Sequence, residues 1–372
     1  MRYSYARLGV IAAVVFIVFS TFFYASLPDD RPFSCRTLKT CGFQPPPEYP
    51  HEVPEGFFNN TEEEEGQWAD GTLYYRREVP DTNPNVLFLT LNKDATAWGK
   101  DFLSTGRSIQ DFVNLLITTD LDFTAVSLGV MTASRDEFDA IKRETQAYPF
   151  ARISVFFQEA SGPDTNIPYK DRHDPEVQRQ RRARLSILRN YLMLRSLQDE
   201  PHMVWVNADI AEFSPGIVQA MIGHAEERPG DVGLITARCS KYRPDDDYDH
   251  NAWSLDRDAP GLLGPVAEKD HETAALRLGN TRHHVDELVK GTNDDDLIPL
   301  DSVGGTILYI RSSLVHRGVT FPPFYVVGTM FGHDGWVGIE TEGICYIVQQ
   351  LGDGAGCFLL GGSHKVRHVD SD

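Results

Sequence analysis

The feature that most constrains this chain is an apolar stretch without a charged residue, from Leu8 to Leu27 (LGVIAAVVFIVFSTFFYASL). A helix of this length rises about 30 Å, which matches the hydrocarbon core of a bilayer. A cleaved signal peptide has a shorter apolar core and ends in small residues at its cleavage site. Because Ala25-Ser26-Leu27 fits such a site poorly, we predict an uncleaved transmembrane helix.

The charges that flank this stretch predict its orientation. Arg2 and Arg7 precede it, and Asp29-Asp30 follows it. By the positive-inside rule, the end that carries the arginines stays in the cytosol. We therefore expect a single-pass type II membrane protein, with a cytosolic tail at residues 1–7, a signal anchor at residues 8–27 and a luminal remainder.

Residues 28–85 have the composition of a luminal stem. Several prolines and a run of four glutamates favour extended, solvated chain. The only N-glycosylation sequon of the sequence, Asn59-Asn60-Thr61, lies here. Cys35 and Cys41 can pair in an oxidising lumen, but the five cysteines form an odd total, so their connectivity stays open.

Residues 86–372 read as one globular domain in which apolar runs alternate with helical patterns. Runs rich in β-branched or aromatic residues predict buried strands at 85–91, 152–158, 202–209, 232–239 and 305–311. Helical spacing predicts helices at 101–116, 135–147, 175–197 and 215–227. This alternation implies an α/β fold with a layered sheet. No GxGxxG follows the first strand and no GxxxxGK[ST] occurs, which argues against a standard dinucleotide-binding or P-loop domain.

The charge balance excludes one class of partner. The chain has 54 acidic and 35 basic side chains, a formal net charge of −19. Proteins that track nucleic acid bind its phosphates with lysine and arginine. We therefore expect no nucleic-acid partner.

The predicted helix at 175–197 is rich in arginine. Arg181 and Arg184 share its apolar face, and three others fall together on another face: Arg179, Arg182 and Arg189. A buried guanidinium needs a carboxylate or phosphate partner. The helix could therefore cradle a diphosphate, or its arginines could form internal salt bridges or extend to solvent.

The strand at 202–209 ends in Asn207-Ala208-Asp209. Two oxygen-bearing side chains at the carboxyl end of a buried strand point toward the crevice where α/β proteins bind ligands. Such oxygens suit Mg²⁺ or Mn²⁺, which often bridge to substrate phosphates. The alternative is that Asp209 only caps the turn that follows the strand.

A region rich in glycine, aromatic and acidic residues, residues 321–343, lies near the C-terminus. Tyr325 and Trp336 could stack on a sugar ring, and Glu340 and Glu342 point the same way in an extended segment. We favour a mobile substrate loop over an ordinary connection. Downstream lie two histidines, His364 and His368, either solvated or reaching back to a metal.

Several segments occur in the order found in a known family. They are Leu89-Thr90, the arginine-rich helix, WVNADIAEF (205–213), the YDxNxW pattern (248–253), DSVGGTILYI (301–310), FPPFYVVGT (321–329) and GIETEGICYI (338–347). On these segments the chain resembles the fungal Anp1/Mnn9/Van1 family of Golgi mannosyltransferase subunits. The resemblance runs from about residue 85 to residue 370.

The resemblance implies a GT-A-like nucleotide-sugar-binding fold with a mixed, mostly parallel central sheet, preceded by the transmembrane helix. It also implies GDP-mannose as donor, Mn²⁺ as cofactor and an N-glycan mannan acceptor that is extended by α-1,6 linkages. The family works in complexes, so the expected partners are other mannosyltransferase subunits of the same family, in the Golgi membrane.

Roles are carried over by position. Asp209 and His368 are the expected metal ligands, with His364 as a substitute. The expected donor-binding residues are Thr90, Arg181, Arg182, Arg189 and Asn207, and the residues expected to act catalytically on the donor sugar or acceptor are Asp301, Glu340 and Glu342. An α-linked donor that gives an α-linked product means retention of configuration, and carboxylates can support the positive charge of such a reaction.

Two positions depart from the family pattern. Asn207 stands where the family has aspartate, and Ala133-Ser134 stands where it has Asp-Ser. An amide lacks the negative charge with which a carboxylate attracts a metal ion. The alternative function is therefore a largely non-catalytic structural subunit of a mannan polymerase complex.

Overall fold

The computed structural model describes residues 47–100, 106–159, 175–241, 247–256, 273, 279–326, 338–351 and 355–369. The predicted cytosolic tail, the membrane anchor and the first part of the predicted stem, including Cys35 and Cys41, lie outside these residues. Within the described ranges, no helix is both long and apolar enough to cross a membrane.

A ten-stranded sheet forms the centre of the described region. Its strands are, from one edge to the other, β1 (Glu62–Gln67), β2 (Leu73–Glu78), β5 (Arg152–Phe157), β4 (Val126–Thr132), β3 (Val86–Asn92), β6 (His202–Val206), β13 (Ile307–Arg311), β8 (Val232–Thr236), β14 (Gly356–Leu360) and β12 (Leu297–Leu300). Strands β3, β4 and β6 are almost entirely buried. Their continuous apolar sequences follow from being covered on both faces.

Seven strands of this sheet run in one direction, and three run in the other. Strands β5, β4, β3 and β6 are parallel neighbours, and β8 and β14 are parallel too. The three reversed strands, β2, β13 and β12, pair only antiparallel with their neighbours. The prediction of an α/β fold with a mixed, mostly parallel sheet is therefore confirmed.

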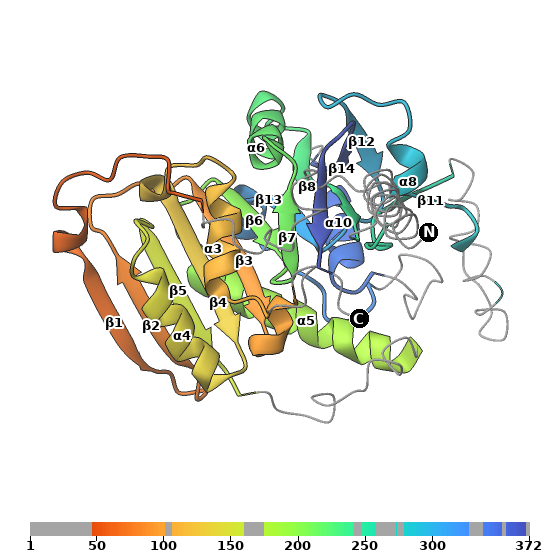
Figure 1. Cartoon of the computed structure of the whole chain (residues 1–372). Helices are drawn as coiled ribbons and strands as arrows, with labels where there is room; N and C mark the ends of the chain where they lie inside the picture. Colours follow the sequence, from red (N-terminus) through yellow and green to blue (C-terminus); the bar gives the residue numbers. More distant parts are fainter. Residues whose placement is uncertain are drawn as a thin grey trace, which may run out of the picture. The chain divides into compact units, whose positions relative to one another are not determined.

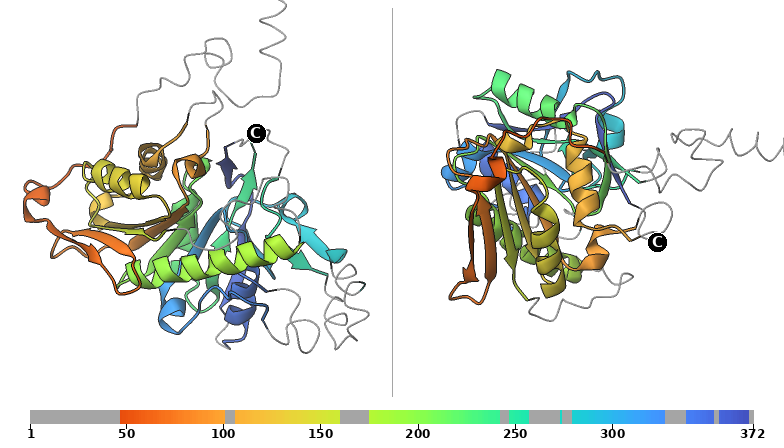
Figure 2. Two further views of the ribbon diagram at one scale, coloured as in Figure 1. Left: turned by 90° about the horizontal axis from the view of Figure 1, so that it is seen from below. Right: turned by 60° about the vertical axis from the view of Figure 1, so that its left-hand side comes forward.

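Helices cover both faces of this sheet (Figures 1 and 2). One buried cluster joins the strands to α3 (Ile109–Ile117), α4 (Arg135–Thr145) and α6 (Ile217–Glu227). The other joins them to α5 (Pro175–Ser196), α9 (Ser312–His316) and α10 (Thr341–Gln349). Neighbouring residues of β3 divide between the two clusters, Phe88 into the first and Leu87 into the second, because side chains alternate along a strand.

The predicted helices match α3, α4, α5 and α6, with ends that differ by a few residues. The helix predicted to begin at residue 101 begins at Ile109, where the Ser108 side chain accepts from a backbone N–H and Asp111 accepts from the Ser108 backbone. Helix α4 begins after Ser134, whose hydroxyl accepts from the Glu137 N–H. These caps satisfy backbone donors that a helix leaves free at its start.

The sheet begins earlier in the sequence than predicted, because β1 and β2 fall within residues 28–85, which were assigned to a stem. Tyr75 and Arg77 of β2 are buried. The Arg77 guanidinium donates to the carbonyls of Gln146 and Tyr148 just beyond α4. The assignment of this part to solvated chain is therefore wrong, because pairing with β5 buries every second residue of a polar strand. Asn59 of the sequon is exposed.

Two smaller sheets complete the described part. In one, β15 (Lys365–His368) lies between β7 (Ile210–Phe213) and β9 (Arg238–Ser240), antiparallel to the first and parallel to the second. In the other, β10 (Trp253–Leu255) pairs with β11 (Arg282–His284), which leads into α8 (Val285–Leu288).

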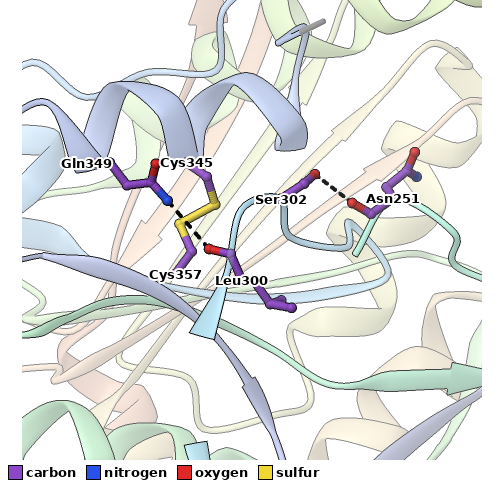
Figure 3. The surroundings of a disulfide bond; sticks show 6 residues. All are labelled: Asn251, Leu300, Ser302, Cys345, Gln349 and Cys357. Carbon is purple, nitrogen blue, oxygen red and sulfur yellow. Dashed lines mark hydrogen bonds between the residues drawn. A yellow bond between two sulfur atoms is a disulfide. The ribbon is translucent and has the colours of Figure 1, made fainter. Parts of the chain in front are cut away.

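A disulfide joins α10 to the sheet. Cys345 on the helix is bonded to Cys357 on β14 (Figure 3). Beside it, Gln349 Nε2 donates to the Leu300 carbonyl. Cys239 is buried as a free thiol, and burial raises its pKa well above the ordinary value. The odd cysteine count had left this connectivity open.

Candidate functional site

The strand order places a switch point between β3 and β6. The chain moves from β3 to β4 to β5 in one direction and then returns to place β6 on the other side of β3. In open α/β sheets, ligands bind outside the carboxyl ends of the strands at such a point. Thr90 lies near the carboxyl end of β3, and its neighbour Leu89 pairs with Trp205 of β6. Asn207 and Asp209 follow β6 at the same edge of the sheet. The candidate site is therefore this edge.

Asp209 and His368 meet at this edge although they lie far apart in the sequence. Nε2 of His368 is 2.8 Å from Oδ2 of Asp209. Pairing of β15 with β7 brings the histidine there, and the Val369 N–H donates to the Asp209 carbonyl. Gly99 is required beside them, because a Cβ at this residue would come within 2.2 Å of the Val369 side chain.

The ring of His368 is held in one orientation. Its Nδ1 donates to the Val369 carbonyl, and Tyr248 stacks on it with ring centroids 3.8 Å apart. Donation from Nδ1 leaves Nε2 to face Asp209. A metal-binding histidine commonly uses its second nitrogen in this way.

The residues present at this position fit a divalent ion. Oδ1 of Asp209 is buried and has no hydrogen-bond partner among the described residues. A carboxylate and an imidazole whose lone pairs converge are stabilised by a cation between them. Within the described ranges, no group of three or more His, Cys, Asp or Glu side chains is placed to hold a metal ion. Asp209 and His368 could therefore hold Mn²⁺ only with further ligands from outside this set, such as substrate phosphates.

Backbone near Asp209 is fixed by a residue that the sequence analysis missed. The guanidinium of Arg107 donates to the carbonyls of Trp98 and Ile210, at 3.0 and 2.9 Å. Arginine donors are suited to such carbonyls because the guanidinium has several N–H groups in a rigid plane. Arg107 precedes α3 without a motif around it, so no sequence pattern indicates this role.

Arg189 is the buried arginine of α5. Its side chain is 6% exposed, and its Nε lies 3.0 Å from Oε1 of Glu340, which is 8% exposed. The expected inward residues Arg181 and Arg184 are placed otherwise: Arg181 is exposed and Arg184 is half-buried. The prediction from the apolar face was wrong, because the buried stripe of α5 runs through Ser186, Arg189, Met193 and Ser196.

Glu342 forms a second carboxylate–arginine cluster. Its two oxygens lie 3.5 Å from Nη1 of Arg182 and 3.1 Å from Nη2 of Arg282. Burial raises the pKa of Glu342, against the opposing effect of Arg282 and Arg182. Arg282 also lies 4.1 Å above the ring of Trp253. Internal salt bridges, one of the two interpretations for the arginine-rich helix, therefore describe Arg182 and Arg189.

Asp301 binds backbone. Its Oδ2 accepts from the Leu255 N–H at 2.7 Å, which ties it to β10. A neighbouring acid does more at the site: Asp249 accepts from the backbone N–H groups of Gly305 and Thr306, at 2.8 and 3.2 Å. Asp249 was missed, although it lies inside the YDxNxW segment beside Tyr248, and its position in that segment could have identified it.

The remaining predicted residues that the structure describes are His364, Tyr325 and Thr90. His364 is buried, and its Nδ1 has no hydrogen-bond partner among the described residues. Part of the predicted substrate loop, residues 327–337 with Trp336, lies outside the described residues, and Tyr325 is half-buried. Thr90 is buried, and its hydroxyl has no hydrogen-bond partner in the described ranges.

Relatives of the chain are found among fungal proteins. The mannan polymerase complex subunit mnn9 of Schizosaccharomyces pombe is 25% identical over 260 residues, which covers 64% of this chain and 71% of that protein. The mannan polymerase complex subunit MNN9 of Candida albicans is 24% identical over 289 residues, covering 71% and 74%.

Among solved structures, the chain is similar to the mannosyltransferase PcManGT from Pyrobaculum calidifontis in complex with GDP-Man and Mn²⁺. The TM-score is 0.41 at 11% identity, and the match covers 78% of this chain and 58% of that one.

The sequence pattern of the Anp1 family matches residues 75–325. This stretch includes β3, β6 and the whole of α5 with Arg189. It is more than half of the chain. The protein is therefore a member of the Anp1 family.

Proposed function

We propose that this protein is a metal-dependent, retaining mannosyltransferase with a GT-A-like fold that transfers mannose from GDP-mannose to N-linked mannan, forming the α-1,6 backbone. One observation carries the proposal: Asp209 and His368 converge at the switch-point edge of the sheet. Family membership supports it, because two relatives are subunits of mannan polymerase complexes.

The chemistry requires that negative charge on a departing nucleoside diphosphate be stabilised. A divalent ion held by Asp209 and His368 would neutralise part of that charge when it is bound. The stacking of Tyr248 on His368 and the hydrogen bond from Nδ1 keep the imidazole in place for this task. We also assign Thr90 to the donor site, because its buried hydroxyl has no hydrogen-bond partner among the described residues.

The acidic residues expected to act catalytically divide into two kinds. Glu340 and Glu342 are paired with arginines, so we assign them to shaping the site rather than to attack on the donor. Asp301 is half-buried and uses one oxygen for backbone, which leaves the other to orient a hydroxyl of the donor sugar or acceptor.

We further propose that the protein works in the Golgi lumen, anchored by residues 8–27, in a complex with other subunits of its family. The Cys345–Cys357 disulfide supports an oxidising compartment. The complexes named for the relatives support partner subunits.

The alternative proposal is a largely non-catalytic structural subunit of such a complex. It is favoured by Asn207, which stands where a second carboxylate would strengthen metal binding. The arginine pairing of Glu340 and Glu342 also fits it, because these carboxylates then serve the fold.

Calorimetric titration of the full chain in detergent with GDP, with and without Mn²⁺, separates the two proposals. We expect binding that depends on Mn²⁺ and falls at least 100-fold in Asp209→Ala. A matched control is Asp199→Ala, an exposed acid before β6, at the opposite end of that strand. Folded wild-type protein that binds no GDP with Mn²⁺ would favour the structural subunit.

A further inference from the structure

The Asn207 side chain has a defined orientation, and its origin is a buried ion pair. We infer that Arg189, held by Glu340, turns the Asn207 amide so that its oxygen faces the guanidinium and its NH₂ group faces the ligand. Asn207 then donates a hydrogen bond to an anionic oxygen, as on the diphosphate of a nucleotide sugar, and is not a metal ligand. The identity of that ligand rests on the proposed function.

Protein groups restrain the guanidinium of Arg189 on several sides, although its buried Nη1 has no hydrogen-bond partner among the described residues. Glu340 lies against Nε, and Nη2 donates to the Gly305 carbonyl at 3.1 Å. The rings of Trp205 and Phe321 lie 5.0 and 5.3 Å from its central carbon. Such contacts with aromatic rings are favourable for a planar cation. Together these contacts restrain the orientation of the guanidinium.

Glu340 reaches this position at a cost in backbone strain. Its φ is 61° and its ψ is −126°, a region that residues other than glycine rarely adopt. Its N–H donates to the Pro322 carbonyl, which holds the backbone in this conformation. Strain of this kind persists where the surrounding structure requires it. Here the strained residue presents its carboxylate to Arg189.

Gly305 lets Arg189 approach the site. A Cβ at Gly305 would lie 2.9 Å from Nη2 of Arg189, which is closer than Cβ atoms approach other groups. The backbone N–H of Gly305 is in turn held by Asp249. Nη2 of Arg189 can thus reach Asn207, and the contact to Oδ1 is 3.5 Å long.

The direction of this hydrogen bond determines which atom of the Asn207 amide faces Arg189. A guanidinium has donors and no acceptor, so the atom of Asn207 that faces it is the oxygen. Nδ2 therefore points the other way. It is not among the buried polar atoms that lack a partner, and no described residue accepts a hydrogen bond from it. Since Asn207 is half-buried, its NH₂ group is open to a ligand.

The substitution of amide for carboxylate then changes what this position binds. An aspartate would present a negative oxygen where Asn207 presents N–H, and it would repel a phosphate oxygen. With the amide, the carboxylate of Asp209 remains as the charged ligand for a metal. Asn207 then supplies a neutral hydrogen-bond donor beside it.

The order of affinities among three side chains tests this inference. The full chain in detergent, as wild type, Asn207→Ala and Asn207→Asp, is titrated with GDP at saturating Mn²⁺. If the NH₂ group donates to the nucleotide, we expect wild type to bind best, alanine about fivefold more weakly, and aspartate at least tenfold more weakly than wild type. Loss of one hydrogen bond corresponds to roughly this first factor.

A metal-ligand role for the amide oxygen predicts a different order. Aspartate keeps that oxygen and adds charge, so it would bind GDP as well as or better than wild type, and alanine would be weakest. That order overturns the inference while leaving the proposed function intact. Absence of GDP binding by folded wild-type protein overturns both. Asn85→Asp is the matched control, because Asn85 is exposed at the opposite end of β3, and we expect no change in its GDP affinity.

Discussion

Two buried arginine–glutamate pairs lie at opposite edges of the parallel strands. At the amino edge, Nη2 of Arg152 lies 2.8 Å from Oε1 of Glu200, with side chains 6% and 0% exposed. At the carboxyl edge, Nε of Arg189 lies 3.0 Å from Oε1 of Glu340, with side chains 6% and 8% exposed. By burial and distance the two pairs are equivalent.

They differ in what surrounds them. Glu200 uses its second oxygen to accept from the Gln198 N–H, at the turn before β6, so this pair closes a connection. Glu340 is held at a positive φ, and Arg189 continues to Gly305 and Asn207. The burial of an ion pair thus does not reveal its role. The role is revealed by the contacts that the other N–H groups of the arginine make.

Removal of one glutamate from each pair should have the largest effect and should separate the pairs. Glu200→Ala and Glu340→Ala each leave a buried guanidinium without its partner, which costs about 3–5 kcal/mol of unfolding free energy. Only Glu340→Ala should also weaken GDP binding, because only Arg189 orients Asn207. Denaturant unfolding gives the first quantity, and GDP titration of the folded variants gives the second.

The double variant Arg152→Met/Glu200→Leu is the control for the amino-edge pair. Replacement of both ions by apolar groups of similar volume should restore most of the lost stability. An equal loss of GDP affinity in the folded Glu200→Ala variant would contradict the distinction between the two edges.

Glycine in place of alanine at residues 340 and 200 should give a smaller difference in unfolding free energy between the two pairs. At residue 340, glycine relieves the positive φ, so Glu340→Gly should be more stable than Glu340→Ala by about 1 kcal/mol. Glu200 is not among the described residues with positive φ, so Glu200→Gly should be less stable than Glu200→Ala, by about the same amount. Unfolding midpoints of the four variants measure both differences. If the glycine variant were less stable than the alanine variant at both residues, residue 340 would not be strained.

The smallest expected effect is a pH dependence of the free energy of unfolding, which arises at the amino edge. His202 begins β6, and burial lowers its pKa from the ordinary 6.5. The unfolded chain therefore binds a proton at a pH where the folded chain does not, so stability falls as pH drops below about 6.5. His202→Gln should flatten this part of the stability curve, measured by unfolding at pH values from 5 to 8. An unchanged slope in the variant would assign the dependence to other groups.

The sequence predicts the strands and helices whose pattern is local. Strand β3 was predicted to within one residue at each end, and α5 to within one residue at its end. The run predicted at 232–239 divides into β8 and β9, because the chain passes from the large sheet into the small one at Ala237. Apolar periodicity signals burial but not the sheet to which a strand belongs.

Strands and contacts that depend on distant partners could not be read in this way. Pairing with β5 buries Tyr75 and Arg77 of the polar strand β2, and β15 is short and carries charged residues. The carboxylate that faces Arg189 comes from the start of α10, far along the chain. The sequence pattern and the resemblance both pointed to Asp209 and His368 as candidate metal ligands, but their proximity depends on the pairing of β15 and β7.

The central place of β15 in the small sheet has a consequence for how the protein is made. Roughly 160 residues separate Asp209 from His368, and translation of that many takes on the order of ten to thirty seconds. During this interval β7 and β9 each lack the strand that pairs with them in the described small sheet, and uncovered edges invite pairing with other chains. We therefore expect the newly made chain to depend on chaperones until β15 emerges and pairs with both strands.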